Sequence, residues 1–122
     1  MALSANFSVN QGSTFLYQAT LKDETGTGIP AASLATFILT YYDFTTGQII
    51  NGRAAQNILN ANGVTINASG NVAWTGTPSD SVVVSNRYAE ELHVALLQWT
   101  YGSKGGSYRM GLLIQNTDRS FN

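Results

Sequence analysis

Residues 92–115, LHVALLQWTYGSKGGSYRMGLLIQ, decide the fold class of this chain, because two alternating apolar runs flank a glycine-rich segment. Side chains alternate between the two faces of a β-strand. One face of the first run therefore carries His93, Ala95, Leu97, Trp99 and Tyr101. The opposite face is also largely apolar, and burial on both faces predicts a central strand.

The second run predicts a strand that pairs with the first. Its apolar face carries Tyr108, Met110, Leu112 and Ile114. Between the runs, Gly102, Gly105 and Gly106 are expected to supply the positive φ angles of a short hairpin loop. Ser103 and Lys104 keep the tip of this loop polar. We expect the rest of the chain to pack onto this hairpin.

Shorter strand patterns precede the hairpin. Alternation and β-branched or aromatic enrichment predict strands at residues 6–9, 14–22, 34–44, 48–50, 64–66 and 71–75. Residues 53–62 have roughly helical apolar spacing, closed by Gly63, and predict one short helix. Roughly seven or eight strands without βαβ alternation predict an all-β fold, an antiparallel β-sandwich. Trp74 and Trp99 are expected to fill the space between its sheets.

The composition sets limits on size and partners. The chain of 122 residues predicts one domain, residues 1–122, with a polar arm at 1–5 and a tail at 116–122. Only 11% of residues are charged and the net charge is -1, which argues against nucleic acid as a partner. A surface of Asn, Ser, Thr and Gly is buried at small desolvation cost and suits assembly. A plain all-β domain with polar loops explains the same composition equally well.

The sequence also limits compartment and membrane contact. Cysteine is absent, so the chain forms no disulfide and no thiolate metal site. No run approaches the roughly 18 apolar residues of a membrane span, and the N-terminus lacks the features of a secretory signal. We therefore expect a soluble, unexported chain without membrane contact.

Catalytic and metal-binding patterns are weak. His93, the single histidine, is either a metal ligand or general base, or a sheet histidine hydrogen-bonded to a neighbour, which we favour. Glu90 and Glu91 point to opposite faces of an extended strand and do not form a hydrolytic pair. Asp23 and Glu24 lack the spacing of a calcium loop. We expect no enzymatic activity, no cofactor and no bound metal.

Several tyrosines leave a second kind of function open. Exposed on one face, they would stack against sugars: Tyr41, Tyr42, Tyr88, Tyr101 and Tyr108. Alternation places Tyr101 and Tyr108 near the hairpin end. A carbohydrate or cell-surface binding module is therefore an alternative function.

The order of sequence features resembles that of tailed-bacteriophage virion proteins with an immunoglobulin-like β-sandwich. The features are FSVNQGSTF (7–15), KDETGTGIP (22–30), ATFILTYYD (35–43), INGRAAQNILNANGVTINASGNVAWTGTPSD (50–80) and a closing pair ending GLLIQN (111–116). The order is similar to that in the N-terminal domain of phage baseplate upper proteins, and the resemblance covers nearly the full chain.

The resemblance implies a structural role in many copies on a capsid or tail, in a virion assembled in the host cytoplasm. Baseplate proteins continue into further domains, whereas nothing here follows residue 122, so we expect a capsid decoration or cement protein. A small tail, baseplate or head-tail fitting protein is the alternative. The expected partners are the phage major capsid protein or tail proteins, and further copies of this chain.

Candidate contacts with such partners lie in polar segments and at sheet edges, since an edge strand is a template for strand addition. They belong to the arm, the loop at 76–89, the hairpin tip and the tail. The residues are Met1, Ala2, Leu3, Ser4, Ala5, Arg87, Tyr88, Ser103, Lys104 and Phe121.

Overall fold

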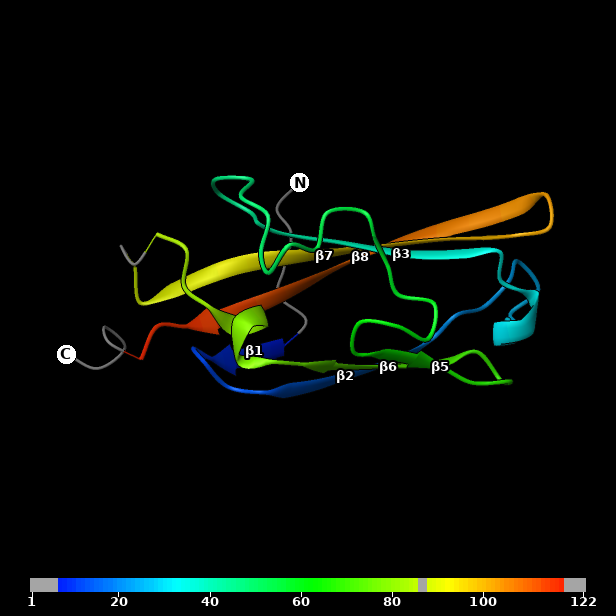
Figure 1. The fold of residues 1–122 in the computed structure, drawn as a ribbon, viewed down its shortest axis with the longest axis horizontal. Coiled ribbons are helices and arrows are strands. Elements are labelled where there is room, and N and C mark those ends of the chain that lie inside the picture. The colour runs from blue at the N-terminus through cyan, green and yellow to red at the C-terminus, as the bar shows by residue number, and fades with distance from the viewer. Residues whose placement is uncertain (1–6, 86–87, 118–122) are drawn as a thin grey trace.

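A computed structural model describes residues 7–85 and 88–117, which form two facing β-sheets (Figure 1). The strands are β1 (Phe7–Asn10), β2 (Phe15–Thr20), β3 (Thr36–Asp43), β4 (Gln56–Asn57), β5 (Val64–Ile66), β6 (Asn71–Gly76), β7 (Glu90–Tyr101) and β8 (Lys104–Gln115). Two short 3-10 helices, η1 (Ala31–Ser33) and η2 (Pro78–Ser81), connect them. Within these residues, no helix has the length and apolar character that crossing a bilayer requires.

The two sheets differ in size. The larger has the order β1-β8-β7-β3-β4 and the smaller the order β2-β6-β5. β7 is central in the larger sheet, as its two apolar faces predict. The pairs are antiparallel except for β1, which runs parallel to β8. The prediction of a purely antiparallel arrangement is therefore wrong at this pair, because β1 and β2 lie in different sheets and do not form a hairpin.

Most of the predicted strands are confirmed to within two residues at each end. The exceptions are the segment at 48–50, which forms only an isolated bridge between Tyr42 and Ile49, and β8, which begins at Lys104 inside the segment predicted as the hairpin loop. The core between the sheets is built on aromatic packing. Trp74 is 2% exposed, and its ring centroid lies 5.0 Å from that of Phe15 and 5.2 Å from that of Tyr41. Trp74 therefore fills the space between the sheets, whereas Trp99 is only partly buried.

The predicted helix at 53–62 is absent, and this prediction is wrong. Ala55, Asn60 and Asn62 have φ angles of 48°, 51° and 56°, which a right-handed helix excludes. Arg53 is buried in a bidentate pair with Asp80, with Nε–Oδ1 and Nη2–Oδ2 distances of 2.6 and 3.0 Å. Asparagine turns and a buried ion pair thus replace the helix, and apolar spacing alone reveals neither.

The β7–β8 hairpin is confirmed, but its loop is shorter than predicted. Tyr101 pairs with Lys104, which leaves a two-residue turn in which Gly102 has a φ of 59°. Gly105 and Gly106 belong to β8 instead. A Cβ on Gly106 would lie 2.6 Å from the ring of Trp99, so glycine is needed there to make room for the indole.

Candidate docking surface and the polar cluster beneath it

One end of the sandwich carries exposed apolar side chains on its loops. We call it the loop end and define it as residues 44–49, 82–85 and 88, on the left in Figure 1. β3 ends and β7 begins there, since Asp43 pairs with His93. The exposed fractions are 49% for Phe44, 38% for Ile49, 39% for Val82 and 59% for Tyr88. Exposed apolar side chains on loops held by a rigid scaffold are typical of partner-binding surfaces.

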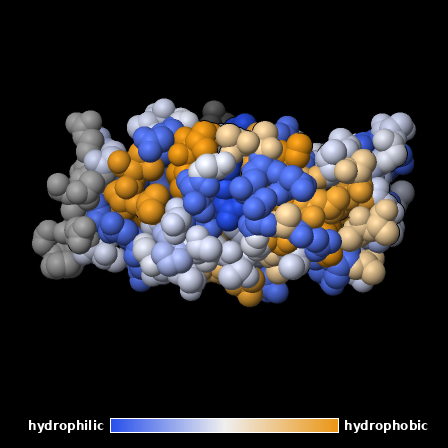
Figure 2. All heavy atoms as spheres, viewed as in Figure 1, coloured by the Kyte–Doolittle hydropathy of each residue, from blue (hydrophilic) through white to orange (hydrophobic). Residues whose placement is uncertain are grey.

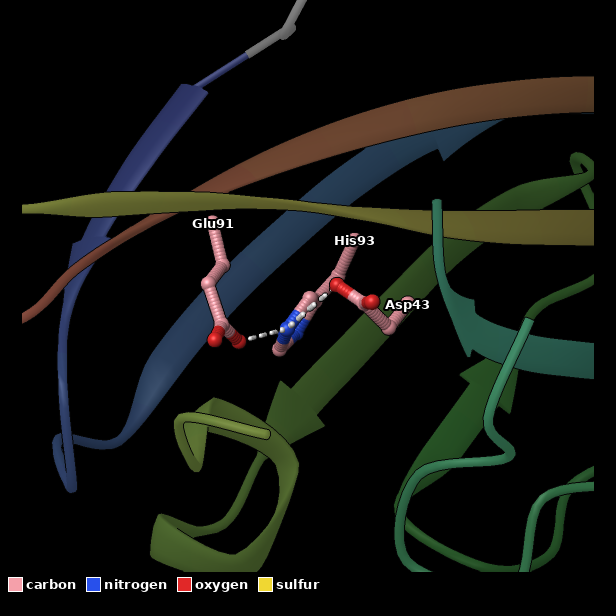
Figure 3. Close-up of side chains that lie close together, drawn as sticks. All are labelled: Asp43, Glu91 and His93. Atoms are coloured by element: carbon pink, nitrogen blue, oxygen red, sulfur yellow. Dashed lines mark hydrogen bonds and ion pairs between the residues drawn. The ribbon is translucent and has the colours of Figure 1, made fainter. Parts of the chain in front are cut away.

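A buried polar cluster lies beneath the loop end and consists of Asp43, Glu91 and His93 (Figure 3). Glu91 and His93 are two positions apart on β7 and share its inner face, and Asp43 on β3 is paired with His93. The exposed fraction is 3% for Asp43, 5% for Glu91 and 0% for His93. His93 Nε2 lies 3.0 Å from Glu91 Oε1 and 3.7 Å from Asp43 Oδ1.

Glu91 fixes one segment of the loop end. The backbone N–H of Val84 donates to Oε1, and the N–H and hydroxyl of Ser85 both donate to Oε2, each at 2.7 Å. Burial alone would raise the pKa of Glu91, but these hydrogen bonds and that of His93 lower the pKa to about 2. The ionised carboxylate thereby holds residues 84–85 against β7.

Asp43 fixes the other segment. The N–H and hydroxyl of Thr46 donate to Asp43 Oδ2 at 2.9 and 2.8 Å, and the N–H of Gly47 donates to the Asp43 carbonyl at 2.8 Å. The turn that carries Phe44 and Ile49 is therefore anchored by the same cluster as residues 84–85. Both loop segments are pre-organised by one set of buried carboxylates.

His93 is neutral in this arrangement. Burial lowers its pKa and outweighs the raising effect of Glu91 and Asp43. Nδ1 is buried and has no hydrogen-bond partner in the described structure, so a second ring proton there would be unsatisfied. A neutral ring whose Nε2–H donates to Glu91 fits these surroundings. The prediction of a sheet histidine hydrogen-bonded to a neighbour is confirmed.

The same three residues have a donor set that suits a metal ion. Their ligand atoms all lie within 4.8 Å of one another, and an imidazole with carboxylates is a ligand set for zinc or manganese. However, both oxygens of Glu91 and one of Asp43 already accept hydrogen bonds from the loop end. In this geometry the cluster serves to hold loops, and the expectation of no bound metal stays a prediction.

The residues predicted as contacts lie at both ends of β7. Tyr88 belongs to the loop end, whereas Ser103 and Lys104 are exposed at the hairpin tip. The contacts predicted at Met1, Ala2, Leu3, Ser4, Ala5, Arg87 and Phe121 lie outside the described residues. Sequence reasoning missed Phe44 and Ile49, whereas Val82 lies in the loop at 76–89 that was predicted as a contact segment. The available signal was an apolar residue beside a turn, as in Phe44-Thr45-Thr46-Gly47.

The face of the sandwich shown in Figure 2 is polar in its middle, whereas the loop end exposes apolar side chains. Hydrophilic residues gather in the middle of this face, over the segment between β3 and β5, with hydrophobic residues on either side. Beneath them, Arg53 Nη1 also donates to Gln56 Oε1 at 2.7 Å and to the Asn62 carbonyl at 3.0 Å. A network of hydrogen bonds around Arg53 therefore supports the polar surface of this face.

Comparisons with known proteins do not identify a relative. No family model, no curated protein and no solved structure matches the chain. The arguments for its function therefore rest on the geometry of the two ends of the sandwich.

Proposed function

We propose that this protein is a non-enzymatic structural component of a tailed-bacteriophage particle, most simply a capsid decoration or cement protein. The observation that carries the proposal is the loop end, where apolar side chains are exposed on loops that a buried cluster holds in place. Loops that are ordered before binding lose less conformational entropy when they dock. Its partner is the major capsid protein, and its location is the virion.

An immunoglobulin-like topology is the finer fold that we infer, and the strand order supports it. Immunoglobulin-type sandwiches contain the strand order B-E-D in one sheet and C-F-G in the other. Numbered from β2 as strand B, the small sheet follows β2-β6-β5 and the large sheet contains β3-β7-β8. β1 corresponds to strand A in chain order, but it pairs in parallel with the last strand and so lies in the other sheet from β2.

The small size of the exposed apolar set supports docking in many copies. The loop end has four large apolar side chains that are between 38% and 59% exposed, whereas each side of a stable protein interface has about 20–30 residues. Such a contact becomes multivalent on a lattice if neighbouring docked copies also contact one another, and the linked copies then bind with avidity. The chain is also poor in charge, at 11% of residues, as the core of an interface requires.

Co-sedimentation with purified capsids and, separately, purified tails tests this proposal. We expect the protein to bind capsids at a fixed number of copies per particle. Binding to tails alone would favour the alternative, a small tail, baseplate or head-tail fitting protein. A protein that sediments as free chains with both particles would contradict the structural role.

A further inference from the structure

The β7–β8 hairpin extends past the strands of the smaller sheet (Figure 1). Its inner face lines a groove together with β2 and the loop after β2. Two adjoining hollows of about 310 and 490 Å³ share Lys22 and Trp99. Both volumes fall within the roughly 300–1,000 Å³ of small-ligand sites. We call this feature the hairpin groove. The residues that matter for its chemistry are Tyr17, Lys22, Trp99, Tyr101, Lys104 and Tyr108.

The groove exists because the strands differ in length. β7 and β8 have 12 residues each, whereas the strands of the facing sheet have six or fewer. The inward side chains near the tip of the β7–β8 hairpin therefore extend past the facing sheet. Tyr108 is 45% exposed, and Trp99 and Tyr101 are partly exposed.

Trp99, which both hollows share, is held in place by its neighbours. The indole of Trp99 lies against Gly106, where a Cβ would come within 2.6 Å of the ring, and contacts Phe37 edge-on at 6.4 Å between centroids. Burial, and then the neighbouring Tyr108, raise the pKa of Tyr17, so its hydroxyl stays protonated as a donor. The groove thus offers a fixed aromatic surface at Trp99 and a protonated hydroxyl group at Tyr17.

The charges at the rim of the groove cancel. Lys104 Nζ lies 2.6 Å from Glu24 Oε2. Asp23 Oδ1 accepts hydrogen bonds from Thr25 and from the N–H of Thr27, within its own turn. A phosphate-rich ligand needs an excess of positive charge, and the two lysines are offset by the two acids. The groove favours a neutral ligand.

We propose that the hairpin groove binds a neutral oligosaccharide. A sugar ring has an apolar C–H face and a rim of hydroxyls, which matches aromatic side chains with an apolar body and a polar tip. The inference goes beyond particle docking, because the groove lies at the opposite end of β7 from the loop end. β7 is roughly 35 Å long over its 12 extended residues, and the loop end lies at its first residues whereas the groove lies along its last five. A copy docked through its loop end would present the groove to solvent.

An array of neutral glycans, followed by titration of the best hit with the full chain, tests this inference. We expect Tyr101→Ala combined with Tyr108→Ala to weaken binding at least tenfold. Tyr88→Ala, an exposed tyrosine at the loop end, is the matched control and should bind as the unmodified chain does. Thermal unfolding of each variant shows that the fold is retained.

Three results would overturn the inference: no neutral glycan bound, binding only to acidic glycans, or binding that survives both groove substitutions. Tyr108→Phe provides a second check, because it keeps the ring and should retain most of the affinity. None of these results bears on particle docking, which depends on Phe44 and Tyr88. Failure of one proposal is therefore distinguishable from failure of the other.

Discussion

At the residue scale, His93 couples the stability of the sandwich to pH. Its imidazole is fully buried between Glu91 and Asp43, and burial lowers its pKa. The unfolded chain takes up a proton near pH 6.5 that the folded chain does not. Because the unfolded state then binds more protons, the free energy of unfolding falls as pH falls. Glu91 acts in the same direction at lower pH.

We predict that His93→Gln removes the loss of stability between pH 7 and pH 5, because His93 is the only histidine. Urea unfolding at several pH values measures this. The steeper loss of stability below about pH 4.5 should remain in this variant. Because folding lowers the pKa of Glu91 from 4.5 to about 2, its carboxylate adds about 3 kcal/mol to the free energy of unfolding above pH 4.5, and this contribution is lost as the pH falls. Glu91→Gln should flatten that lower limb instead. Equal slopes between pH 7 and pH 5 in His93→Gln and the parent chain would contradict the assignment.

Ala55 gives a second prediction at this scale. It has a φ of 48°, in the left-handed region that disfavours residues with a Cβ. We predict that Ala55→Gly stabilises the protein by about 0.5 kcal/mol, after the entropy that glycine adds to the unfolded chain. The neighbouring Ala54 lies outside that region, so Ala54→Gly should destabilise by about the same amount. Thermal unfolding distinguishes the two signs, and a loss of stability in both variants would refute the argument.

At the scale of elements, alternation predicts what depends on a repeating pattern. β5 (Val64–Ile66) has the predicted bounds, and the central position of β7 follows from its two apolar faces. Apolar spacing failed at 53–62, where Asn60 and Asn62 form turns and Arg53 pairs with a distant Asp80. Alternation also predicts part of the polar cluster, because it places Glu91 and His93 on the same face of one strand. The contribution of Asp43 requires the pairing of β3 with β7, which no local pattern contains.

The tight turn between β5 and β6 gives a prediction for an element. Gly70 has a φ of 83°, and a Cβ there would lie 2.8 Å from the backbone N and O of Ile29. We predict that Gly70→Ala destabilises the protein by roughly 3 kcal/mol, from strain and overlap together. Gly26 has a φ of 85° but open space around it, so Gly26→Ala should cost only about 1–2 kcal/mol. Urea midpoints that shift equally would show that the contact with Ile29 is unimportant.

At the scale of the whole molecule, the two ends of β7 expose different kinds of side chain. The loop end exposes apolar side chains on loops that Glu91 and Asp43 hold. The hairpin end exposes aromatic side chains beside paired charges. The rigid sheet between them fixes their separation. We propose that one end meets the particle and the other meets a glycan, so each can be altered without the other.

The occupancy of capsids by loop-end variants tests the central claim most directly. The measurement is quantitative co-sedimentation of the parent chain, of Phe44→Ser combined with Tyr88→Ser, and of Leu16→Ser. Leu16 is the matched control, because it is 57% exposed on β2 and lies outside the loop end. We predict a fixed copy number for the parent chain and Leu16→Ser, and at least tenfold weaker binding for the double variant. Equal occupancy by all three proteins, or no binding by the parent chain, would contradict docking through the loop end.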